Sequence, residues 1–326
     1  MYKTTNQNEQ EKILITGVAG FIGSHVAEKL LKTTNHIIIG IDNINSYYDQ
    51  KQKQRNLNLL TRYPNFIFIE DDIVTTNVIT VHKPTIVIHL AAMAGVRYSI
   101  ENPKTYVRNN VEGITNLLNQ AALQHDPAIK NFIYASSSSV YGINKKVPFT
   151  EDDPINKCNS PYAATKKCCE IMADLYSQLY DLPLIGLRFF TVYGPRGRPD
   201  MAPYKFLYRI ANSLPITKYG DGTAMRDYTY IDDIVTGVIN SISYISPTGH
   251  SIFNLGNSTP HSLNQFISLC EKVTNKKAII EQFPDQLGDV PKTYADITRA
   301  RNLLKYEPKT TLEEGLRRTY EWIDSN

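Results

Sequence analysis

The feature that most constrains the fold is a glycine-rich turn at residues 17–23, between a predicted strand and a predicted helix. Residues 12–16 read Lys-Ile-Leu-Ile-Thr, an apolar run typical of a buried strand, and Val26, Leu30 and Leu31 continue with a helical period. Glycines spaced G-x-x-G-x-x-G in such a unit permit a tight turn and let a pyrophosphate approach the backbone. The turn predicts a dinucleotide-binding α/β fold. Its expected cofactor contacts are Gly17, Gly20, Phe21, Ile22 and Gly23.

The acidic residue that ends the next predicted strand, at residues 36–41, indicates which dinucleotide binds. That strand leads into Asp42 and Asn43. A carboxylate about 20 positions after such a turn accepts hydrogen bonds from the adenosine ribose. Asp42 would repel a 2′-phosphate, which favours NAD over NADP. An Asp that only caps the following segment is the alternative interpretation.

Strands and helices alternate through the first half of the chain. Further strands are predicted at residues 66–69, 85–90, 131–135 and 184–190, and a long helix at 103–124. The fully apolar strand at 85–90 is typical of a parallel sheet that is covered on both faces. This alternation predicts a doubly wound parallel α/β sheet of the Rossmann type.

The pattern changes at the loop 194–200, which is rich in Gly and Pro, and shorter mixed elements follow it. We expect a disordered tail at 1–11, a Rossmann domain at 12–190 and a smaller C-terminal lobe at 191–326. Segments near 226–256 are expected to return to the first lobe.

Charge and cysteine content exclude several classes of protein. The 35 basic and 32 acidic residues give a net charge of +3, and no basic block dominates, so nucleic-acid binding is not indicated. The densest basic run, Lys51 to Arg55, is interpreted as a solvated helix face. No apolar run approaches the ~20 residues that cross a bilayer, and the N-terminus lacks a signal-peptide pattern. The four cysteines form no C-x-x-C pair, so we expect free thiols, no metal site and a cytoplasmic location.

A tyrosine and a lysine stand one helical turn apart in residues 160–166. Pro161 suits the first turn of a helix, and an apolar stripe continues at helical spacing through residues 168–179. Tyr162 and Lys166 therefore lie on one face of that helix. The ammonium stabilises a phenolate, so Tyr162 can act as a general base.

The glycine turn, Asp42, the serine cluster at 136–139 and the Tyr162–Lys166 pair together resemble the extended short-chain dehydrogenase/reductase family. The resemblance runs from residue 12 to about 322. It implies that Ser137, Tyr162 and Lys166 are catalytic and that NAD is the cofactor. The further cofactor contacts that it implies are Asn43, Asp72, Ile73, Leu90, Ala91, Ala92 and Asn110, besides Tyr162 and Lys166 themselves.

Several stretches are similar to the UDP-glucuronate 4-epimerase subgroup. They are residues 41–49, 94–99, 134–142, 188–195, 197–201, 226–233 and 288–291. The resemblance implies an isomerase that interconverts UDP-glucuronate and UDP-galacturonate through a 4-keto intermediate, with tightly bound NAD and a sugar-nucleotide-binding C-terminal lobe. The implied substrate contacts are Arg97, Ser138, Thr191, Arg198, Arg226, Gln286 and Asp289.

Arg198 is the implied partner of the substrate carboxylate, because a guanidinium meets a carboxylate in a bidentate fork. The alternatives are that it binds diphosphate or orders its loop. Thr191 stands where epimerases of neutral sugars usually carry Asn. Arg196, where the subgroup often has Trp, is expected to add a second cation near the sugar pocket. Arg97 would either bind substrate or cap the pocket.

Competing functions differ in the residues that they need. A 4,6-dehydratase needs an acid and a base, usually Asp-Glu, where this chain has Ser138-Ser139. A 4-keto-sugar reductase and an epimerase of UDP-glucose or UDP-N-acetylglucosamine stay open. A non-catalytic NAD-sensing scaffold would be favoured by loss of Ser137, Tyr162 or Lys166, all of which are present.

The remaining features concern structure and assembly. His89, at the end of a buried strand, and His25 are expected to be structural. The apolar stripes at 107–121 and 168–179 match the two helices through which relatives form homodimers by a four-helix bundle. Packing of both stripes on the sheet of the same chain would explain the same pattern.

Overall fold

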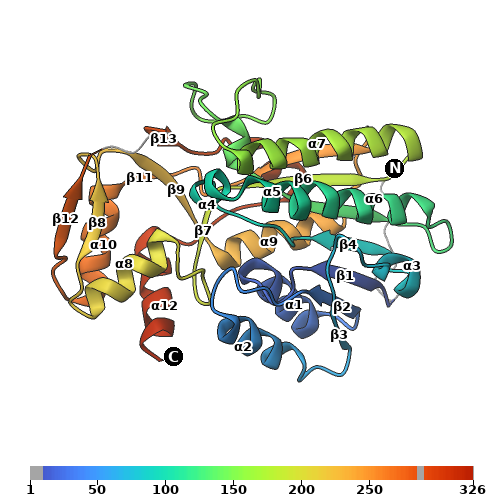
Figure 1. Cartoon of the computed structure of the whole chain (residues 1–326), viewed down its shortest axis with the longest axis horizontal. Coiled ribbons are helices and arrows are strands. Elements are labelled where there is room, and N and C mark those ends of the chain that lie inside the picture. The colour runs from blue at the N-terminus through green and yellow to red at the C-terminus, as the bar shows by residue number, and fades with distance from the viewer. Residues whose placement is uncertain (1–9, 285–289, 326) are drawn as a thin grey trace.

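The computed structural model describes residues 10–284 and 290–325 and has a large and a small lobe (Figure 1). The large lobe is built on a parallel seven-stranded sheet of order β10-β6-β5-β4-β1-β2-β3. The predicted doubly wound α/β fold is confirmed. The strands are β1 (Lys12–Thr16), β2 (Ile37–Asp42), β3 (Phe66–Glu70), β4 (Ile86–His89), β5 (Asn131–Ser137), β6 (Leu184–Phe189) and β10 (His250–Leu255).

Both faces of this sheet are covered by helices. Successive strand residues point to opposite faces, and because the side chains on both faces are apolar, both faces must be buried. In β1, Ile13 and Ile15 join one hydrophobic core and Leu14 joins the other. The first core includes α1 (Phe21–Thr33) and α9 (Ile231–Ile242). The second core is covered by α3 (Val78–His82), α6 (Gly113–Leu123) and α7 (Pro161–Tyr180).

The segment predicted as one long helix at 103–124 is helical but not uniformly α-helical. It comprises α5 (Pro103–Tyr106), a π-helix at Val107–Glu112 and then α6. A π segment shifts the side chains that follow it around the helix axis, and such segments occur frequently at functional sites. This one contains Asn109 and Asn110, of which Asn110 is buried.

Over the described residues, the small lobe (left in Figure 1) consists of short strands and three helices. Strand β9 (Met225–Tyr230) pairs with three others and carries the chain back toward α9. The other elements of this lobe are β7 (Thr191–Tyr193), α8 (Ala202–Ala211), β8 (Ile216–Tyr219), β11 (Pro260–Ser262), α10 (Leu263–Thr274), β12 (Ile280–Phe283), β13 (Lys292–Thr293) and α12 (Leu312–Asp324).

The chain passes from the large lobe to the small lobe and back. It leaves after β6, forms β7 to β9, and returns through α9 and β10, which pairs with β6 from His250↔Leu184 to Leu255↔Phe189. Residues 1–9 of the expected N-terminal tail lie outside the described residues. The remaining short helices are α2 (Gln50–Leu60), α4 (Val96–Glu101), the 3-10 turn Ser138–Tyr141 and α11 (Thr298–Leu304).

None of the helices in the described part of the chain combines the length and the apolar character that crossing a bilayer requires.

Candidate active site

A cavity of ≈ 400 Å³ lies at the carboxyl ends of strands β1, β2, β4 and β5, where parallel α/β sheets bind their ligands. Residues from both lobes line it, and most of the predicted site residues are among them. These are Gly17, Gly20, Phe21, Ile22, Gly23, Asp42, Asn43, Ile73, Leu90, Ala91, Ala92, Ser137, Ser138, Tyr162, Lys166, Thr191 and Arg198.

The glycine turn forms a tight cradle at one end of the cavity. Gly17 has φ +70°, and a Cβ added there would lie 2.8 Å from the backbone of Ala91. A Cβ on Gly23 would lie 2.2 Å from the Gly17 carbonyl oxygen, so neither position accepts a side chain. Helix α1 begins within this glycine-rich stretch, at Phe21, and the free backbone N–H groups of its first turn suit a diphosphate.

Asp42 is fixed at the end of β2, beside this cradle. Its Oδ2 accepts from the Ala19 backbone N–H at 3.1 Å, and its Oδ1 accepts from the Ile44 N–H at 2.9 Å. Burial raises the pKa of the Asp42 carboxyl, and the Lys53 ammonium nearby opposes that rise. The glycine cradle and a held carboxylate one strand away together fit the diphosphate and adenosine ribose of a dinucleotide.

The predicted catalytic trio comes from β5 and α7. Ser137 ends β5, and Tyr162 and Lys166 lie in the first turns of α7. That helix starts where the sequence indicates, because the Ser160 hydroxyl accepts from the Ala163 N–H at 3.2 Å. All three side chains line the cavity, and the buried ammonium of Lys166 donates to the Ala135 carbonyl at 2.8 Å.

Asn110 supports this trio from behind the cavity. Its Nδ2 donates to the Met93 carbonyl at 2.9 Å and to the Thr165 hydroxyl at 3.0 Å, and its Oδ1 accepts from the Met93 N–H at 2.8 Å. It is buried and does not line the cavity, whereas its neighbour Asn109 does. Asn110 therefore joins the π-helix to the start of α7, next to Tyr162.

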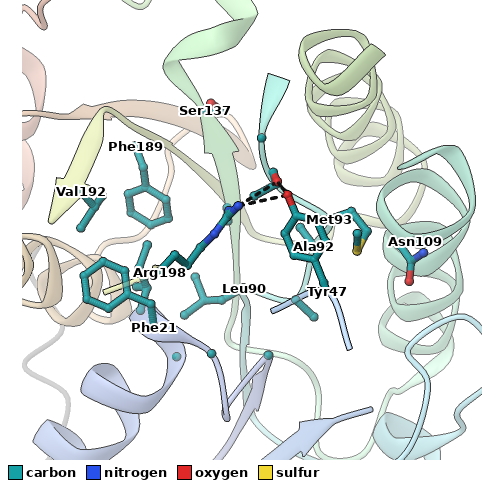
Figure 2. A pocket seen from close by; sticks show the side chains of 18 of the residues that line it. Phe21, Tyr47, Leu90, Ala92, Met93, Asn109, Ser137, Phe189, Val192 and Arg198 are labelled. Atoms are coloured by element: carbon teal, nitrogen blue, oxygen red, sulfur yellow. Dashed lines mark hydrogen bonds between the residues drawn. The ribbon is translucent and has the colours of Figure 1, made fainter. Parts of the chain in front are cut away.

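Arg198 also lines the cavity, and its guanidinium is held by several partners. Its Nη2 donates to the Tyr47 hydroxyl at 3.1 Å and to the Ala94 carbonyl at 3.3 Å (Figure 2). Asp200 forms a bidentate ion pair with the same group, at 3.0 Å to Nε and 2.6 Å to Nη2. Thr191 lines the same cavity.

Arg196 does not lie near the sugar pocket, so that expectation is wrong. Its side chain is buried against α1, where Nη2 donates to Glu28 at 2.6 Å and Nε donates to His25 Nε2 at 3.3 Å. The Gln52 side chain donates to its carbonyl at 2.6 Å. Arg196 has φ +60°, and this left-handed residue turns the loop so that residues 196 and 198 point to different places. These bonds attach the loop that carries Arg198 to α1.

The two histidines are structural, as predicted. The His89 ring lies 2.8 Å from the Thr16 hydroxyl, and burial lowers the pKa of His89 to about 3. His25 Nδ1 donates to the Phe21 carbonyl at 2.8 Å, which leaves Nε2 to accept from Arg196. Burial and the Arg196 charge lower the pKa of His25 to about 3, so both rings are neutral.

Some predicted contacts lie outside the cavity. Arg97, on α4, stacks over the Tyr219 ring at 5.1 Å, and Arg226 donates to the Val290 carbonyl at 2.7 Å. The Asp72 carboxylate pairs with Arg108 at 2.9 Å, whereas its neighbour Asp71 lines the cavity. Gln286 and Asp289 lie outside the described residues.

The profile of the GDP-mannose 4,6-dehydratase family matches residues 14–319. The chain belongs to this family. It is therefore an extended short-chain dehydrogenase/reductase.

Three relatives within the family are informative. The UDP-glucuronate 4-epimerase of Thermodesulfobacterium geofontis is 44% identical over 318 residues, which cover 96% of each chain. A crystal structure of UDP-glucuronic acid 4-epimerase from Bacillus cereus, in complex with UDP-glucuronic acid and NAD, is 36% identical with a TM-score of 0.91, covering 96% of this chain and 99% of that one. UDP-glucose 4-epimerase from Thermotoga maritima, with UDP-glucose, is 32% identical with a TM-score of 0.86 and the same coverage.

Tyr47 and Lys53 are among the cavity residues that were missed from the sequence of this family member. Tyr47 lies in a stretch that carried the resemblance but received no role. Lys53 was interpreted as part of a solvated face, yet it is buried, lines the cavity and donates to the Asn45 carbonyl and side chain, each at 2.9 Å. The available signal was periodicity, because residue 53 falls on the same helical face as Leu57 and Leu60, which are buried.

Proposed function

We propose that this chain is an isomerase that interconverts UDP-glucuronate and UDP-galacturonate and retains NAD. The observation that carries the proposal is one cavity that holds the Ser137–Tyr162–Lys166 trio and the Arg198 guanidinium. The similarity to UDP-glucuronate 4-epimerases over 96% of the chain supports it. When bound against the glycine cradle, NAD supplies the acceptor, and later the donor, of the hydride at sugar C4.

The chain's own residues supply the proton chemistry and the positioning. Ser137 and Tyr162 hold the sugar 4-hydroxyl by hydrogen bonds, and Tyr162 takes its proton as general base and later returns it. The Lys166 ammonium stabilises the phenolate form of that base. General base catalysis contributes about 10²–10⁴-fold, so orientation of the sugar must supply the rest.

Arg198 is proposed to bind the sugar carboxylate, with Thr191 and Ser138 completing that end of the pocket. A guanidinium recognises a carboxylate through two parallel N–H bonds, which a neutral hydroxymethyl group cannot accept in the same way. Epimerisation of UDP-glucose or UDP-N-acetylglucosamine is the second candidate, favoured by the 32% identity to a UDP-glucose 4-epimerase. Dehydration is disfavoured, because Ser138 and Ser139 line the cavity where that reaction needs an acid and a base.

The test is NMR of UDP-glucuronate, UDP-glucose and UDP-N-acetylglucosamine, each incubated with the purified protein and no added reductant. We expect the C4 epimer in the UDP-glucuronate sample. Faster reaction of a neutral sugar would support the second candidate and refute the uronate assignment. Turnover only with added NADH would indicate a reductase.

We further propose that the chain is a homodimer through α6 and α7, which lie side by side on one face of the sheet (Figure 1). On α7 the stripe of Cys168, Leu175 and Leu179 is exposed, because Ala173 and its neighbours face the sheet instead. On α6 the stripe packs on the sheet, but Leu123 is exposed.

Two α6–α7 pairs would form a four-helix bundle that buries these apolar side chains. In sedimentation experiments, the Leu175→Glu variant should be a monomer. The control variant Ile245→Glu, which changes an exposed residue elsewhere, should remain a dimer. A wild-type monomer would refute this assembly.

We also propose that different parts of the chain bind the cofactor and the sugar nucleotide. Residues 12–190 would hold the cofactor, with return segments near 226–256, and residues 191–326 would mainly hold the sugar nucleotide, with Arg226, Gln286 and Asp289 at its nucleotide end. A cytoplasmic location is proposed from the free cysteines of the described chain.

A further inference from the structure

A guanidinium can bind a carboxylate in a bidentate fork along either of two edges, Nε–Nη2 or Nη1–Nη2. In Arg198, both edges already take part in hydrogen bonds. Asp200 occupies the Nε–Nη2 edge, with its two oxygens 3.0 and 2.6 Å from those atoms. The Tyr47 hydroxyl and the Ala94 carbonyl accept from Nη2, which the other edge also needs (Figure 2). A second carboxylate that approaches in a bidentate fork must therefore displace a bond that is already made.

Of these partners, Asp200 is the one that water can best replace. Its side chain is 49% exposed, whereas the Arg198 side chain is 15% exposed. A carboxylate released to solvent regains its hydration, whereas a largely buried guanidinium needs a counter-charge. Tyr47 is held in addition by its own bond to the Ala94 carbonyl, at 2.6 Å.

We propose that Asp200 takes the place of the substrate carboxylate in the absence of substrate. It neutralises the charge of Arg198 until the carboxylate of an anionic sugar replaces it there. The inference rests on the proposed function and adds a residue that determines specificity. A uronate brings a replacement counter-charge, so it can release Asp200 to solvent. A neutral hexose brings none, so Asp200 stays on Arg198 and the neutral sugar gains nothing from that end of the pocket.

Asp200→Asn tests this, because the amide keeps the size of the side chain but removes the competing charge. Dissociation constants of UDP-glucuronate and UDP-glucose are measured by calorimetry on the NAD-loaded protein. We expect about three- to tenfold tighter binding of UDP-glucuronate and a change of less than about twofold for UDP-glucose. Asp152→Asn, which breaks an exposed ion pair with Arg299 elsewhere, should change neither constant.

A structural role for Asp200 predicts the opposite sign. If Asp200 only orients Arg198, then Asp200→Asn weakens UDP-glucuronate binding, and that result, or no change, overturns the proposal. Asp200→Ser is the second variant if the first does not fold, and Asp200→Glu should retain the wild-type preference. Failure of the proposed function looks different, because the wild type would then bind UDP-glucuronate no better than UDP-glucose.

Discussion

The Ser136 hydroxyl donates a 2.6 Å hydrogen bond to Glu170 and so ties the end of β5 to α7. The same buried carboxylate forms a bidentate ion pair with Arg188, at 2.8 and 2.9 Å. Ser136 precedes Ser137, and Glu170 follows Lys166 by one helical turn. The bond therefore fixes the two elements that carry the proposed catalytic trio relative to each other.

Glu170→Gln should destabilise the protein by about 3–5 kcal/mol, because Arg188 would be left as an uncompensated buried charge. The measurement is the free energy of unfolding in urea. A second change, Arg188→Met, should recover much of that loss by removing the orphaned charge. A loss below about 1 kcal/mol for Glu170→Gln would contradict this account of the pair.

Tyr162→Phe should lower turnover of UDP-glucuronate by about 10²–10⁴-fold, because it removes the proposed general base. Binding of the nucleotide sugar should persist, since only a hydroxyl is lost. Turnover is followed by NMR and binding by calorimetry. Tyr176→Phe, on the same helix but outside the cavity lining, is the matched control and should keep wild-type turnover.

Tyr47→Phe should raise KM for UDP-glucuronate by about tenfold, because one hydrogen bond that orients Arg198 is lost. The effect on kcat should be smaller, since Tyr47 does not belong to the proposed catalytic trio. Steady-state kinetics with UDP-glucuronate and UDP-glucose separate the two effects. An equal rise in KM for both sugars would argue against a role at the carboxylate end.

Asp42→Asn should improve binding of NADP⁺ relative to NAD⁺ by about fivefold, because it removes one charge that would repel a 2′-phosphate across a hydrated site. The two dissociation constants are compared by calorimetry on nucleotide-free protein. Asp71→Asn, another carboxylate that lines the cavity, provides the comparison. An unchanged ratio for Asp42→Asn would show that Asp42 does not set cofactor choice.

The buried neutral His25 should make stability fall in acid. Its pKa is about 3 in the folded protein and about 6.5 when unfolded, so the unfolded state binds more protons between these values. The contribution is complete above pH 6.5 and is lost as pH falls toward 3. His25→Gln should reduce the slope of unfolding free energy against pH in this window, by up to about 1.4 kcal/mol per unit. Urea titrations at several pH values give that slope, and an unchanged slope would mean that His25 binds its proton equally well in the folded and unfolded states.

The fold was predictable because its signals are local. The β-branched runs, the glycine turn and Ser160-Pro161 each specify a strand, a turn or a helix start within a few residues. The carboxyl ends of adjacent parallel strands then bring the predicted residues to one edge of the sheet. That is why Asp42 and Ser137, far apart in sequence, line the same cavity.

The errors concern contacts between segments distant in sequence. Arg196 and Arg198 are two residues apart and were expected in one pocket, but the left-handed backbone at Arg196 sends its side chain to α1. Whether Lys53 meets solvent depends on where α2 packs, which no local pattern of charges specifies. The bond between Tyr47 and Arg198 joins residues 151 positions apart.

The position of β10 has a consequence for how this protein is made. The strand that completes the sheet edge at β6 comes from residues 250–255, so it leaves the ribosome only after the first part of the small lobe, from β7 to β9, has been synthesised. Until then, β6 presents unpaired backbone groups that other chains can pair with. Nascent chains that stall before residue 250 should therefore associate with one another or with chaperones, even though every residue of the proposed catalytic trio has already been synthesised.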